Sequence, residues 1–129
     1  METVEEAKKI FDKDRFAMMT GCEILEVGKG YAKCQLKVTD KILNGYDKVM
    51  GGAIFTLADF TFGVASDSIA VSTTGNITYL NATKGDTLFA VANCVKDGNT
   101  LVCYEIKVTD NLGKEIALVT MSGMKVMKL

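Results

Sequence analysis

Residues 51–66 read GGAIFTLADFTFGVAS, and this stretch decides the expected fold. It is apolar on nearly every side of a helical projection, which is typical of a buried helix rather than a surface helix. Gly51 and Gly52 stand at its start, and Asp59 is the one charged residue within it. We therefore predict a central buried helix that carries a single carboxylate.

The flanking segments predict a sheet that packs on this helix. An amphipathic helix is expected at 2–19, a loop with a turn at Asn44-Gly45 is expected at 40–50, and period-two alternation indicates strands. The expected strands are 23–27, 31–39, 72–80, 87–96, 100–109 and 114–127. This order predicts an α+β fold with a largely antiparallel sheet. We expect one domain over residues 1–129.

The last expected strand is apolar on both faces. One face carries Ile116, Leu118 and Met124, and the opposite face carries Ala117, Val119 and Met121. A sheet with both faces apolar is usually covered on both sides. We therefore expect the outer face of the sheet to pack on another subunit. The alternation of residues 31–39 places Cys34 on the inner, core-facing side.

The composition excludes several kinds of site. The 129 residues contain no His, so catalysis by Ser-His or Cys-His pairs and His-based metal sites are excluded. The net charge is −1 and Arg15 is the only Arg, which makes nucleic acid a poor partner. No cofactor or metal is expected. The four Cys form no C-x-x-C pair, and no signal or membrane-spanning segment is visible, so we expect a reduced, cytoplasmic protein that does not enter membranes.

Asp59 and the two glycines are candidates for chemistry. Burial of a carboxylate raises its pKa toward a value useful for a general base. A structural Asp that bonds a neighbouring hydroxyl is an equally good interpretation. The free N–H groups at a helix start can polarise a carbonyl, although a glycine pair there can also serve packing alone.

The spacing of these groups predicts a shared site. Asp59 follows Gly51 by eight positions, which is roughly 12 Å along a helix. One reacting carbonyl does not reach both groups at hydrogen-bond distance. If both serve one reaction, they come from different subunits related by a two-fold axis.

The stretch NGYDKVMGGAIFTLAD, residues 44–59, resembles the hotdog-fold acyl-CoA thioesterases, as do Ser72 and the later NITYL at 76–80. The nearest branch is the phenylacetic-acid-pathway (PaaI-like) type. The resemblance implies a sheet wrapped around a central helix. It also implies that Gly51 polarises the thioester carbonyl and that Asp59 acts as general base or nucleophile. Asn44 is expected to position the thioester or water, and Ser72 to orient the water.

The resemblance implies hydrolysis of acyl-CoA to a free acid and CoA by a homodimer or homotetramer. Met50 and Gly52 are expected to line the substrate site. The family usually has His at the position of Met50, and a thioether cannot act as donor or base. This departure favours the alternative function, a non-catalytic hotdog protein that binds an acyl thioester or a similar ligand. Four aromatic residues are expected either to line a pocket or to fill the core, and the core is the favoured interpretation: Phe55, Phe60, Phe62 and Tyr79.

Overall fold

Six strands form one antiparallel sheet in the computed structural model, which describes residues 2–67 and 69–126. The helices are α1 (Val4–Phe11), α2 (Arg15–Thr20), the 3-10 helix η1 (Asp40–Ile42) and α3 (Gly51–Ala65). The strands are β1 (Glu23–Gly28), β2 (Tyr31–Lys37), β3 (Ala70–Tyr79), β4 (Thr87–Asp97), β5 (Leu101–Asp110) and β6 (Glu115–Lys125). Their order across the sheet is β1-β2-β4-β5-β6-β3.

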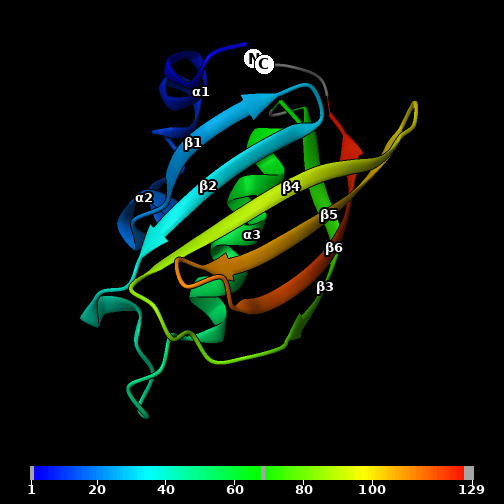
Figure 1. Ribbon diagram of the computed structural model, residues 1–129. Helices are drawn as coiled ribbons and strands as arrows, with labels where there is room; N and C mark the ends of the chain where they lie inside the picture. Colours follow the sequence, from blue (N-terminus) through cyan, green and yellow to red (C-terminus); the bar gives the residue numbers. More distant parts are fainter. Residues whose placement is uncertain (1, 68, 127–129) are drawn as a thin grey trace.

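The sheet curves around α3, which lies in its concave side (Figure 1). Most of the apolar residues of α3 are buried, as are the inward-facing residues of β2, β4, β5 and β6. Cys34 is among them with no exposed surface, so its expected core position is confirmed. The α+β architecture with a buried central helix is confirmed as well. Its driving force is removal of this apolar surface from water.

Two glycines allow α3 to approach the sheet closely. A Cβ at Gly75 of β3 would lie 2.9 Å from Cζ of Phe55, and one at Gly123 of β6 would lie 2.7 Å from Cζ of Phe62. Real Cβ atoms do not tolerate such contacts, so the aromatic rings of α3 rest on these glycines. Phe60 and Phe62 are core residues as expected, and Phe55 is half-buried.

The edge strand β3 is the least covered part of the sheet. The chain leaves β2, passes through α3, forms β3 at the far edge and then returns to β4 in the middle (Figure 1). Within the described residues β3 pairs only with β6, and eight of its ten residues are exposed. An unpaired, exposed strand edge is a ready template for another strand.

The expected helix at 2–19 is wrong in one respect, because it divides into α1 and α2. Asp14 caps the start of α2, where its Oδ1 accepts a hydrogen bond of 3.4 Å from the N–H of Ala17. Gly21 then ends α2 with φ 106°, a left-handed conformation that glycine adopts without a Cβ penalty. Asp12, at the end of α1, and Asp14, at the start of α2, therefore separate the two helices.

The expected alternation of β6 is correct for its inner face and wrong for Ile116. Ala117, Val119 and Met121 are buried, whereas Leu118 and Met124 are exposed in the single chain. Ile116 is buried as well, because the register with β5 shifts between Thr109 and Val108. A bulge of this kind adds one residue and reverses the alternation beyond it. The expected strand end at Met127 lies outside the described residues.

Candidate functional site

Asp59 lies in the third turn of α3, half-buried and facing β3. Its Oδ1 accepts a hydrogen bond of 3.1 Å from Oγ of Ser72. Burial raises the pKa of Asp59 above its ordinary value, the Ser72 hydroxyl lowers it in part, and the nearby Asp14 carboxylate raises it again. The net effect is a raised pKa, which brings this carboxylate nearer to the range in which a general base operates.

A β-bulge at Thr73 places Ser72 beside Asp59. Ser72 pairs with Gly123 of β6 and Thr74 pairs with Ser122, so Thr73 is the extra residue. Strict alternation would point Ser72 and Tyr79 to opposite faces of the strand. Because the bulge reverses the alternation once, both side chains lie on the inner face, toward α3.

The start of α3 presents free backbone donors. Met50 is the N-cap residue and makes no side-chain capping bond, while its own N–H is anchored to the carbonyl of Ile42 at 2.7 Å. None of the described residues accepts a hydrogen bond from the N–H of Gly51 or Gly52. These two amides therefore retain their donors and lie at the positive end of the helix dipole.

Tyr79 fixes the position of Gly51, a role that the sequence reasoning missed. The Tyr79 hydroxyl donates a hydrogen bond of 2.9 Å to the Gly51 carbonyl oxygen, and its ring lies against the Gly51 Cα. Tyr79 does not fill the core, the favoured interpretation, since half of the residue is exposed; it lines a pocket, which was the alternative. Tyr79 faces α3 but is the last residue of the edge strand β3, where few neighbours cover it.

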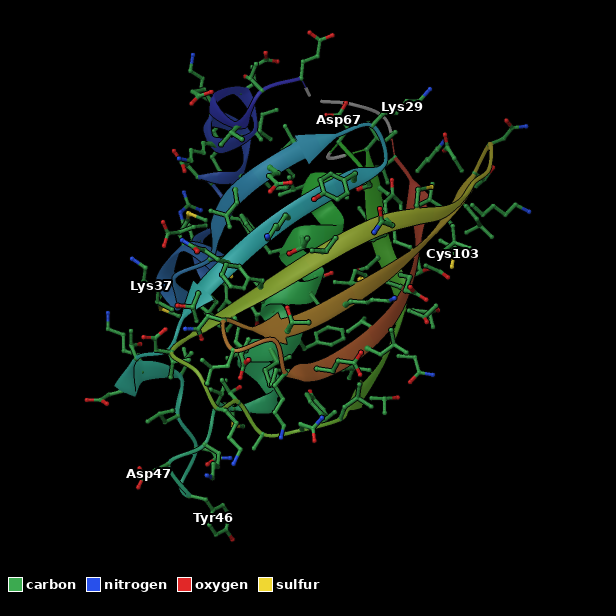
Figure 2. The ribbon with its side chains drawn as sticks, in the orientation of Figure 1. Lys29, Lys37, Tyr46, Asp47, Asp67 and Cys103 are labelled. Carbon is green, nitrogen blue, oxygen red and sulfur yellow. The ribbon has the colours of Figure 1, made fainter. Side chains whose placement is uncertain are left out.

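Asn44 organises the loop that precedes α3. Its Oδ1 accepts hydrogen bonds from the N–H of Tyr46 at 2.9 Å and of Lys48 at 3.1 Å. The loop extends away from the sheet, with Tyr46 and Asp47 at its tip (Figure 2). No described residue accepts a hydrogen bond from Nδ2 of Asn44, so this group retains its donors.

Two cavities flank the start of α3. One, here called the β3-loop pocket, has a volume of about 380 Å³ and is lined by Gly51, Tyr79, Lys48, Asn81 and Thr83, among others. The second, the α2–α3 pocket, has a volume of about 420 Å³ and its lining includes Phe16, Met19, Ile42, Met50, Gly52 and Thr56. Sequence reasoning identified neither Phe16 nor Met19, because both lie outside the apolar stripe of the expected helix.

A third cavity, larger than these two, lies elsewhere. It has a volume of about 710 Å³ and is lined by the C-terminal end of α3 and by the β1–β2 turn. Figure 2 shows Lys29 and Asp67, two of its lining residues, at the end of the molecule opposite Tyr46. Size alone therefore does not identify the site, since the candidate residues lie at the start and middle of α3.

The predicted site residues form two groups within one chain. Asp59 and Ser72 are joined by a hydrogen bond. Met50, Gly51 and Gly52 lie at the start of α3, and Asn44 lies in the loop before it. No hydrogen bond within the described residues joins these four to Asp59. Among the described residues, no cluster of three or more His, Cys, Asp or Glu is arranged to hold a metal ion. No helix of the described chain has the length and apolar character to span a membrane.

Comparison with known proteins identifies the family. Residues 46–117 match the model of the thioesterase superfamily. The acyl-coenzyme A thioesterase PaaI of Escherichia coli is 31% identical over 88% of this chain and 84% of its own length. The structure of the E. coli PaaI protein from the phenylacetic acid degradation operon superposes with a TM-score of 0.89 at 28% identity, over 95% of this chain and 92% of that one.

A second solved structure was obtained with a ligand. The Streptococcus mutans protein smu.793, bound to acetyl CoA, superposes with a TM-score of 0.79 and is 36% identical, over 84% of this chain and 90% of that one. Residues 46–117, which match the thioesterase superfamily, include both the start of α3 and Asp59. The chain therefore belongs to the thioesterase superfamily, as a PaaI-like member with the hotdog fold.

Proposed function

We propose that this protein hydrolyses acyl-CoA thioesters to a free acid and CoA, with Asp59 as the general base. The observation that carries the proposal is the half-buried Asp59 in α3, whose pKa is raised and whose carboxylate is oriented by Ser72. The thioesterase relatives and the acetyl-CoA complex of a similar protein support the substrate class.

The chemistry follows from these two groups of residues. Asp59 accepts a proton from a water molecule as the water oxygen attacks the thioester carbonyl carbon. The Gly51 N–H holds the oxyanion that forms, with the helix dipole behind it. The C–S bond then breaks, and the proton held by Asp59 returns to the CoA thiolate. The Nδ2 of Asn44 would position the thioester or the water.

A complete site needs two subunits. Asp59 and Gly51 are separated by roughly 12 Å along one helix. In a homodimer formed by antiparallel pairing of the exposed β3 edges, α3 of each subunit lies beside the other and runs in the opposite direction. Gly51 of one subunit then lies near Asp59 of its partner. The exposed edge of β3 supports this assembly.

The alternative function is non-catalytic binding of an acyl thioester or a similar ligand. Met50 favours it, because Met50 is the N-cap residue of α3 and, by the resemblance given above, stands where this family usually has His. A thioether neither donates a proton nor accepts one from water. We favour hydrolysis, because the proposed mechanism assigns proton transfer to Asp59.

The test is hydrolysis of a panel of acyl-CoAs, measured by release of the free thiol, for the natural protein and Asp59→Asn. Asn has a similar shape but cannot accept the proton, so kcat should fall by at least about 100-fold. Asp12→Asn, an exposed Asp between α1 and α2, is the matched control and should retain activity. Full kcat in Asp59→Asn would exclude Asp59 as the general base. Binding of acyl-CoA by the natural protein without hydrolysis would support the non-catalytic function.

A further inference from the structure

The α2–α3 pocket is unusual in the number of large apolar side chains that it leaves in water. Phe16 is 62% exposed, Met19 66% and Met50 51%, and all three line this one cavity of about 420 Å³. Leaving such side chains in water forgoes the stabilisation that their burial would give. Clustered exposure of this kind marks a surface that binds something apolar.

The pocket adjoins the proposed carbonyl site. Gly52, one of the two residues with a free amide, lines the α2–α3 pocket, and Thr56 extends the lining one turn toward Asp59. Gly51, the other, lines the β3-loop pocket on the opposite side of the helix start. A group held at these amides therefore has one cavity on each side.

The two cavities differ in chemistry. The β3-loop pocket carries Lys48 and Asn81, and the Oγ1 of Thr83 is a buried oxygen that has no hydrogen-bond partner among the described residues. A buried hydroxyl without a partner is costly unless a ligand satisfies it. In the α2–α3 pocket, Lys41 is the one charged residue in the lining, and its side chain is exposed.

We propose that the α2–α3 pocket receives the acyl group and selects neutral, apolar acyl chains of medium length, while the amide-bearing pantetheine arm lies on the side of the β3-loop pocket. This inference rests on the proposed function. A thioester whose carbonyl accepts from the Gly51 amide has its acyl carbon and its sulfur on opposite sides of that carbonyl. The apolar cavity suits the hydrocarbon end, and the polar cavity suits the amides.

The dependence of kcat/KM on the length of the acyl chain tests directly whether the α2–α3 pocket receives that chain. Each methylene transferred from water into the pocket should raise kcat/KM about fourfold, until the pocket is full. A terminal carboxylate would be desolvated there, so adipyl-CoA should react much more slowly than hexanoyl-CoA of the same length.

The experiment compares acetyl-, butyryl-, hexanoyl-, octanoyl- and adipyl-CoA in the natural protein, Met19→Glu, Phe16→Glu and Val95→Glu. Both pocket residues are exposed, so a carboxylate there leaves the core intact, and melting temperatures check the fold. Val95 is 68% exposed near the β4–β5 hairpin, so Val95→Glu makes the same change outside the pocket. The slope of log kcat/KM against chain length should flatten in the two pocket variants and persist in Val95→Glu.

The outcomes separate this inference from the proposed function. A natural protein that hydrolyses short and long acyl-CoAs at equal rates, or a slope that survives in both pocket variants, overturns the acyl pocket and leaves hydrolysis standing. A changed oligomeric state in Met19→Glu with an unchanged slope also overturns it, since the patch would then contact a second copy. Hydrolysis of none of the five substrates overturns both.

Discussion

Alanine at Gly51 and at Gly52 tests how tightly the start of α3 is held. The two substitutions make the same chemical change at neighbouring helix positions, and both keep the backbone N–H. A Cβ at Gly51 would lie 3.0 Å from both Cζ and Oη of Tyr79, whereas one at Gly52 would meet only Cγ of Met50 at 3.9 Å. Only the first contact is tighter than ordinary van der Waals packing.

The expected magnitude follows from two opposing effects. Replacing Gly by Ala in a helix gains about 0.5–1 kcal/mol, and this gain is common to both variants. Overpacking costs about 1–3 kcal/mol, and the lower end applies here because the half-exposed Tyr79 ring can shift. Gly52→Ala should therefore be about 1 kcal/mol more stable than Gly51→Ala, or about 3–5 °C in Tm.

The assay is thermal unfolding of both variants at one protein concentration, because assembly contributes to stability. The kcat/KM of Gly51→Ala should also fall by about tenfold, since a displaced amide holds the oxyanion less well. Equal stability of the two variants would refute the contact with Tyr79. Unchanged kcat/KM in a demonstrably destabilised Gly51→Ala would refute the role of the Gly51 amide.

Three further predictions concern Asp59, Asp110 and assembly. Ser72→Ala removes the hydrogen bond that favours the charged form of Asp59, so the pKa of Asp59 should rise. The acid limb of the pH profile of kcat/KM should then move to higher pH, and an unmoved limb would contradict the role of Ser72. Burial raises the pKa of Asp110, but four backbone N–H groups outweigh it and lower the pKa from 3.8 to about 2. The stability that Asp110 contributes is thus present above pH 3.8 and lost as pH falls through about 2. Asp110→Asn should therefore have a lower Tm than the natural protein at pH 7, and this difference in Tm should shrink near pH 2. Light scattering at micromolar concentration should give a dimer or a larger oligomer, and a monomer would exclude the shared site.

The sequence was most informative where one signal dominated. The predominantly apolar run of residues 51–66 predicts α3 and the place of Asp59 within it, because a helix that is apolar on nearly every side is typical of the interior. The expected strands 87–96 and 100–109 are separated by Asp97-Gly98-Asn99, a sequence typical of a hairpin turn, and they correspond to β4 and β5. These features depend on local composition, which the chain carries irrespective of its tertiary contacts.

Features that depend on an interrupted pattern were not predictable. The bulge at Thr73 breaks the period of two, and nothing in residues 70–79 shows where the extra residue lies. The pairing of Ser72 with Asp59 came from family resemblance, while the contact of Tyr79 with Gly51 was missed. The α2–α3 pocket was missed for a different reason. It depends on how α2 packs against α3, and the sequence did not show that a separate helix begins after Asp14.

The central claim is that one catalytic site takes Asp59 from one subunit and the Gly51 amide from its partner. Gly51→Pro removes that N–H at the first helix position, where the Pro backbone is tolerated, and Met50 already has the extended backbone that precedes Pro (ψ 133°). Its Cβ meets Tyr79 as in Gly51→Ala, so the Tm of the variant is measured alongside its activity. Asp59→Asn and Gly51→Pro should each be inactive in both sites of their homodimers.

The deciding measurement is the acyl-CoA hydrolysis rate of these two variants after they are unfolded and refolded together in equal amounts. Random pairing gives about half mixed dimers, each with one intact site, so the mixture should recover about one quarter of the natural activity. Recovered activity at that level supports the shared site. A mixture no more active than the two variants alone, with mixed dimers shown to form, would contradict it.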